Sequence, residues 1–109
     1  MKIAVIGSRD VQSVDIAAYL PPHTTEIISG GARGVDTCAR EYALSHHIPL
    51  TEIRPDYPRY GRAAPLKRNL LIVDAADAVL AFWDGRSRGT RFVIDACEKA
   101  GKPVRVVLV

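Results

Sequence analysis

The chain has 109 residues, of which 48% are hydrophobic and 25% are charged, and its formal net charge at pH 7 is +3. These are ordinary values for one soluble globular domain, and the length excludes a second domain of normal size. No apolar stretch approaches the length of a membrane span. We therefore expect a single domain over residues 1–109, located in the cytoplasm without a membrane partner.

Five short apolar runs predict strands, because strands covered on both faces of a parallel sheet are apolar throughout. They lie at residues 3–6, 26–28, 50–53, 78–83 and 104–109. Segments with helical periodicity alternate with these runs, at residues 11–20, 33–46, 65–76 and 88–100. Pro65 suits a first helical turn, while Gly101 followed by Pro103 is a typical helix stop.

This alternation predicts an α/β fold: a Rossmann-like, doubly wound three-layer sandwich around a mostly parallel five-stranded sheet. Right-handed crossovers give the strand order 3-2-1-4-5. The last strand then lies at a sheet edge, where an uncovered apolar strand promotes aggregation. A homodimer and a covering helix are both possible solutions.

The two cysteines, Cys38 and Cys97, fall within predicted helices and have neither a CxxC spacing nor a Cys/His spacing. A zinc site or a redox pair is therefore not indicated. We expect buried thiols, no metal and no resident cofactor.

The segment from Ser29 to Asp36, with Gly30, Gly31 and Gly34, follows an apolar run directly and precedes a predicted helix. Glycines let backbone N–H groups approach a ligand closely, and the start of a helix favours an anion. Such a loop is suited to phosphate or carboxylate. A glycine turn that only joins a strand to a helix remains the alternative.

In an open parallel sheet, ligands bind outside the carboxyl ends of the strands, where we expect four loops to meet. Arginine and lysine gather in these loops, which favours a polyanionic ligand because the guanidinium fork matches phosphate. The basic residues are Arg9, Arg33, Arg59, Arg62, Lys67, Arg68, Arg86 and Arg88. Some of them are expected to be merely solvated.

Residues 55–64 form the longest irregular segment and are a candidate for a mobile loop over the site. Tyr57 and Tyr60 in this segment, and Trp83 at a strand end, could stack on a base or simply pack against the protein. Three carboxylates near the site have structural alternatives to catalysis. Asp10 and Asp36 could cap helices, and Asp84 could form an Asx turn.

The phosphate motifs GxGxxG and GxxxxGK[ST] do not occur in this sequence. Four other motifs together resemble the SLOG superfamily over essentially the whole chain. They are Gly7-Ser8-Arg9, the segment from Ser29 to Asp36, Tyr60-Gly61-Arg62-Ala63-Ala64-Pro65 with Arg68-Asn69, and Trp83-Asp84-Gly85 with Ser87-Arg88-Gly89-Thr90. The superfamily includes the Rossmann-like domain of the DNA-processing protein DprA, the "lonely guy" phosphoribohydrolases and small YpsA-related proteins. The motifs are most similar to the YpsA-related branch.

The resemblance implies binding of nucleotides or nucleotide-derived ligands. The phosphoribohydrolases carry paired glutamates after the Gly-Thr step of their second glycine motif, whereas Gly89-Thr90 is followed here by Arg91-Phe92-Val93. Because an acid of that kind speeds such reactions by roughly 10²–10⁴, its absence argues against this enzyme class. A second departure is Ala64, where the branch usually has glycine.

We therefore expect no catalytic residue among the site candidates. We expect two helix starts to bind phosphates, while Ser8, Arg9 and Asn69 orient the ribose or the base. Arg68 could instead be structural, pairing with Asp36 or Asp56. The candidate site residues are Gly7, Ser8, Arg9, Ser29, Gly30, Gly31, Arg33, Gly34, Arg68, Asn69, Asp84, Ser87, Gly89 and Thr90.

The sequence favours a protein that binds or senses a nucleotide-derived small molecule. Two alternatives stay open. One is a hydrolase or transferase acting on the N-glycosidic bond of a nucleotide, and the other is a protein that binds single-stranded DNA.

Overall fold

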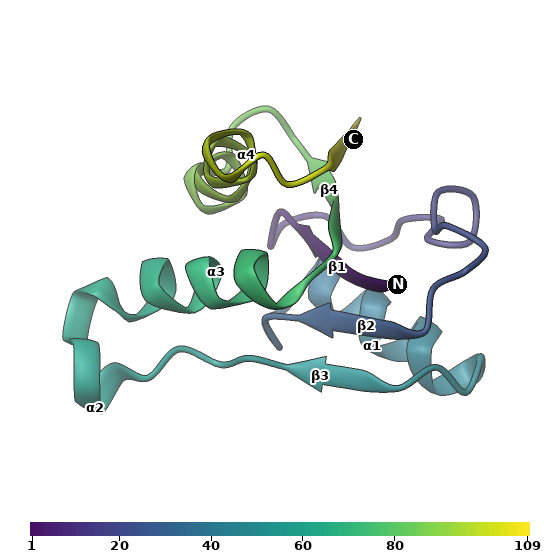
Figure 1. Cartoon of the computed structure of the whole chain (residues 1–109), viewed down its shortest axis with the longest axis horizontal. Helices are drawn as coiled ribbons and strands as arrows, with labels where there is room; N and C mark the ends of the chain where they lie inside the picture. The colour runs from purple at the N-terminus through teal and green to yellow at the C-terminus, as the bar shows by residue number, and fades with distance from the viewer.

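The computed structural model describes all 109 residues, and its strands form one five-stranded sheet in the order β3-β2-β1-β4-β5 (Figure 1). Every neighbouring pair of strands is parallel. The strands are β1 Lys2–Gly7, β2 Glu26–Ser29, β3 Leu50–Glu52, β4 Ala78–Trp83 and β5 Val104–Leu108. The predicted α/β class and strand order are confirmed.

Three long helices connect the strands: α1 Val35–Ser45, α3 Ala64–Ala75 and α4 Arg88–Ala100. The segment predicted to be irregular contains a short helix, α2 Tyr57–Tyr60, and a 3-10 turn, Gly61–Ala63. Asp56 caps α2, since its Oδ1 accepts a hydrogen bond from the Arg59 amide at 3.3 Å. None of the helices combines the length and apolar character that a membrane crossing requires.

Both faces of the sheet are buried. Alternate residues of a strand point to opposite faces, so each strand contributes side chains to the core on both sides. Ile3 and Val5 of β1 pack with Val35 and Ala39 of α1 on one face. Ala4 and Ile6 pack with residues of α3 and α4 on the other face, among them Ile72. The result is the predicted three-layer arrangement, with its core on both sides of β1 and β4.

The helix predicted over residues 11–20 is wrong: this part of the connection between β1 and β2 is coil and turns (Figure 1). The Asp15 carboxylate accepts a hydrogen bond from the Ala18 amide at 3.2 Å, and the Ile16 carbonyl accepts from Tyr19 and Leu20. Asp and Ser compete with helix formation by such local hydrogen bonds. The apolar residues still cover the sheet, with Ile16 only 3% exposed.

Strand β5 lies at the sheet edge, as predicted, and parts of it face solvent: Leu108 is 73% exposed and Val106 is 40% exposed. Its outer backbone groups have no neighbouring strand in the order of the sheet. A homodimer that covers this edge stays a prediction.

Candidate ligand-binding site

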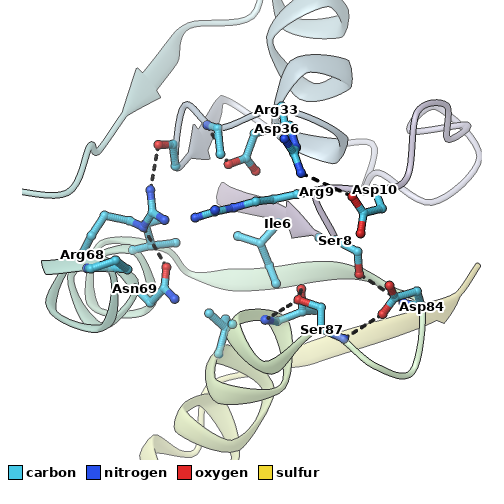
Figure 2. A pocket seen from close by; sticks show the side chains of 18 of the residues that line it. Ile6, Ser8, Arg9, Asp10, Arg33, Asp36, Arg68, Asn69, Asp84 and Ser87 are labelled. Carbon is cyan, nitrogen blue, oxygen red and sulfur yellow. Dashed lines mark hydrogen bonds and ion pairs between the residues drawn. The ribbon is translucent and has the colours of Figure 1, made fainter. Parts of the chain in front are cut away.

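A cavity of about 700 Å³ opens where the loops after β1, β2 and β4 meet the first turns of α3 and α4 (Figure 2). The order of the strands reverses here, since the chain passes from β1 to β2 in one direction along the sheet and from β4 to β5 in the other. Open α/β sheets bind ligands at such switch points. The cavity is within the usual size range of small-molecule sites, about 300–1,000 Å³.

Most of the predicted site residues line this one cavity. Those that do are Gly7, Ser8, Arg9, Gly30, Arg33, Arg68, Asn69, Asp84, Ser87, Gly89 and Thr90. Ser29, Gly31 and Gly34 belong to the same glycine loop but do not line it. Tyr57, Tyr60 and Trp83 also lie outside the lining, and Trp83 donates from Nε1 to the Ser87 carbonyl at 3.1 Å.

Two glycines of the loop after β2 are required by the protein's own packing. A Cβ on Gly30 would lie 2.6 Å from Nη1 of Arg68 and 2.9 Å from Oδ2 of Asp36. Gly34 has φ +75°, and a Cβ there would lie 2.5 Å from the Arg9 carbonyl oxygen. The structure therefore gives these glycines a role in packing, and close approach of a ligand to their backbone stays a prediction.

The Arg68 side chain is 7% exposed and ties α3 to two neighbouring loops. Its Nη1 donates to the Gly30 carbonyl at 2.8 Å and to the Ile53 carbonyl at 3.4 Å, and its Nε donates to Oδ1 of Asn69 at 2.8 Å. Burial lowers the pKa of Arg68, while the nearby Asp36 charge opposes that shift. Arg68 thus has a structural position, as the sequence left open, but its partners are two carbonyls and Asn69, and the predicted ion pair with Asp36 or Asp56 does not form.

Asp36 is buried in the first turn of α1, and its Oδ2 accepts a hydrogen bond from the Ala32 amide at 3.1 Å. The expectation that Asp36 caps this helix is wrong, because Gly34 occupies the cap position and no side chain caps it. Burial raises the pKa of Asp36 above its ordinary value of 3.8, against the hydrogen bond from Ala32 and the charge of Arg68.

The raised pKa predicts how stability depends on pH. Between pH 3.8 and the raised folded-state pKa, the folded protein holds a proton on Asp36 that the unfolded chain has released. The stabilisation is therefore fully present below pH 3.8 and is lost as the pH rises through the folded-state pKa. We expect the free energy of unfolding of the wild type, minus that of Asp36→Asn, to fall over this window and to be level above it. Urea unfolding of both proteins at several pH values measures the difference, and a rise with pH would contradict the assignment.

Arginines from the first two loops contribute positive charge to the cavity. Arg9 has no hydrogen-bond or ion-pair partner in the chain, and Figure 2 shows its side chain extending across the cavity toward Arg68. The charge of Arg9 also contributes to lowering the pKa of Arg68, in keeping with their proximity. Arg33 pairs with Asp10 at 3.4 Å, and both side chains are well exposed. The expectation that Asp10 caps the first predicted helix is wrong, because that helix does not form. Asp10 pairs with Arg33 instead.

The loop after β4 is organised by its own hydrogen bonds. Oδ1 of Asp84 accepts from the amides of Arg86 and Ser87, both at 2.8 Å, which is the predicted Asx turn. These bonds lower the pKa of Asp84. Ser87 caps α4 by accepting from the Thr90 amide at 3.3 Å, and the Asp84 amide donates to Oγ of Ser8 at 3.2 Å. The loops after β1 and β4 are thereby joined.

Two residues that line the cavity have free backbone donors. The amide of Gly89 at the start of α4 and that of Arg33 before α1 donate to no acceptor within the chain. Such amides attract anions, and the helix dipole adds to the attraction. The cavity therefore combines free amides with an unpaired guanidinium.

Sequence reasoning missed the apolar wall of the cavity. It consists of Ile6, Pro65, Leu66, Ile72 and Val93. The spacing of Leu66, Asn69 and Ile72 places them on one face of α3, and this signal could have identified the wall. Asp10, Asp36 and Arg86, which the sequence placed near the site, also line the cavity, as does Ala32.

Two comparisons with known proteins relate the chain to others. Residues 1–53 match the family model of DNA recombination-mediator protein A. The chain is also similar to the Gene 61 protein of Mycobacterium phage D29, with 37% identity over 89 residues, which cover 76% of this chain and 71% of the phage protein. The first match agrees with the resemblance to the superfamily that contains DprA. The finer assignment to the YpsA-related branch stays a prediction.

Proposed function

The chain belongs to the family of the Gene 61 protein of Mycobacterium phage D29, and on this premise we propose that it binds a nucleotide or a nucleotide-derived phosphorylated ligand in the cavity described above. The observation that carries the proposal is the unpaired guanidinium of Arg9, which extends into a cavity bordered by two helix starts. A guanidinium and free amides together match the oxygens of a phosphate.

The mixed lining of the cavity supports a nucleotide over a bare phosphate. Arg9, Arg33 and Gly89 line it together with the apolar side chains of Ile6 and Ile72. Ligand sites usually combine a largely apolar lining with a few placed polar groups. A phosphate and a base linked by a ribose would use both kinds of group.

The hydrogen bonds and ion pair of the carboxylates in the cavity favour binding without hydrolysis. The three acids that line the cavity each have an intramolecular partner: Asp10 pairs with Arg33, Asp36 accepts from Ala32, and Asp84 accepts from two amides of its turn. A general acid or base must reach the reacting proton, and each of these carboxylates already has a partner within the chain. Release of free base from a nucleoside monophosphate would favour the hydrolase alternative.

We expect Arg9→Ala to weaken nucleotide binding by about tenfold or more, because a hydrogen bond to a charged group contributes about 1.5–3 kcal/mol. Isothermal titration calorimetry with AMP, IMP, CMP and UMP measures the effect. Arg91→Ala is the matched control, since Arg91 is exposed, pairs only with Asp95 and does not line the cavity. Equal loss in both variants, or binding of none of the four nucleotides by the wild type, would contradict the proposal.

Single-stranded DNA binding is a second candidate, favoured by the match of residues 1–53 to DNA recombination-mediator protein A. Arg33 and Arg86, which line the cavity, would contact the phosphates of the DNA strand together with Arg88, which follows Ser87 at the start of α4. Contacts with several phosphates make affinity fall steeply with salt. An oligonucleotide that binds with a steep salt dependence, while the mononucleotides do not bind, would favour this candidate over the first.

A further inference from the structure

Asn69 lines the cavity, and only one of the two ends of its side-chain amide has a partner within the chain. It is on α3, is 9% exposed, and lines the cavity together with Ile72. Its Oδ1 accepts from Nε of Arg68 at 2.8 Å, whereas its Nδ2 has no hydrogen-bond partner in the protein. Every fully buried side-chain N or O atom of the protein has a partner, so Nδ2 is an accessible atom of a cavity-lining residue and is free to donate to a ligand.

The orientation of this amide follows from the chemistry of its neighbour. A guanidinium has five N–H donors and no acceptor, so only the oxygen of Asn69 can face Arg68. Arg68 is itself held by the Gly30 carbonyl at 2.8 Å and cannot turn away without losing that bond. Figure 2 shows the oxygen of Asn69 directed at Arg68 and its nitrogen on the other side.

We propose that Asn69 recognises the base of the bound nucleotide by donating a hydrogen bond to it from Nδ2. The site therefore prefers a base with a carbonyl oxygen at the recognised position over a base with an amino group there. This inference rests on the proposed function. A free asparagine recognises adenine by using both of its ends. Here the acceptor end is directed at Arg68, so the donor end faces the ligand.

The apolar wall supports the placement of a base beside Asn69. Ile6 and Ile72 line the cavity, and Val93 of α4 lies in the same lining. The flat, weakly polar ring of a base loses little free energy of solvation by contact with such side chains. The phosphate is attracted to Arg9 and to the amides of α4. Arg68 acts in this arrangement as a positioning residue, because it orients Asn69 without touching the base.

Calorimetry with two matched pairs of nucleotides tests the inference: IMP against AMP, and UMP against CMP. Each pair differs in a carbonyl oxygen that is replaced by an amino group. We expect the wild type to bind the carbonyl member of at least one pair about tenfold more tightly, since an amino group would leave the Asn69 donor unpaired. Asn69→Ala is expected to abolish this preference, and Asn69→Asp, which offers only acceptors, to reverse it.

The outcomes separate this inference from the proposed function. Binding that depends on Arg9, with the same base preference in the wild type and in Asn69→Ala, would overturn only the reading of the base. Absence of binding for all four nucleotides would overturn both. A thermal melt of each variant shows whether it is folded, and Asn69→Ser, which keeps a small polar donor, provides a second test if Asn69→Ala does not fold.

Discussion

Gly34→Ala is expected to destabilise the fold by about 3 kcal/mol, since it combines backbone strain with overpacking. The residue has φ +75°, which side chains rarely adopt, and a Cβ would lie 2.5 Å from the Arg9 carbonyl oxygen and 2.7 Å from that of Ser8. Both obstacles are backbone atoms, so no side chain can move to make room. Urea unfolding followed by circular dichroism measures the loss.

Gly89→Ala is the matched control for this substitution. No atom lies within 4 Å of the position that a Cβ would take on Gly89, and the residue is in the first turn of α4 without a positive φ. Alanine is favoured over glycine in helices by about 1 kcal/mol at most. We expect the control to be neutral or slightly stabilised. Equal destabilisation of the two variants would show that the contact between Gly34 and the Arg9 loop is unimportant.

Arg68→Ala is expected to cost about 3 kcal/mol, because it leaves buried acceptors without their donor and removes the positive charge near Asp36. The side chain makes three hydrogen bonds, to the Gly30 carbonyl, the Ile53 carbonyl and Asn69. These bonds hold the loop after β2 against α3. The free energy of unfolding, taken from urea titrations near neutral pH, measures the effect.

Arg68→Lys distinguishes the contribution of charge from that of geometry. Lysine keeps a positive charge but lacks the planar fork that donates in several directions, so an intermediate loss is expected. Arg91→Ala, which breaks only an exposed pair with Asp95 at 3.8 Å, is expected to change stability by less than about 1 kcal/mol. An Arg68→Ala protein as stable as Arg91→Ala would contradict the structural role of Arg68.

The architecture was predictable because its strongest signals are local. The apolar run Ile3–Ile6 and the run ending at Trp83 both form central strands, and the strand order follows from the handedness of crossovers. The Asx turn at Asp84 was predictable for the same reason, since the side chain bonds to amides only two and three residues away.

What could not be predicted depends on contacts between distant segments. Residues 11–20 have helical spacing, but Asp15 stabilises a turn and the sheet accepts the apolar side chains without a helix. The role of Arg68 follows from the Gly30 carbonyl, which is 38 residues away in the chain. Arg68 and Asn69 were both predicted to be site residues. The hydrogen bond between them, which orients the Asn69 amide, was not predicted.

The coil between β1 and β2 has a consequence for the site, because Arg9 stands at its beginning. This layer covers the sheet with side chains such as Ile16 but contributes few backbone hydrogen bonds of its own. Segments of this kind open locally at a lower free energy than helices do. An anion held by Arg9 would restrain the start of this segment, so we expect occupancy of the cavity to make this face more rigid.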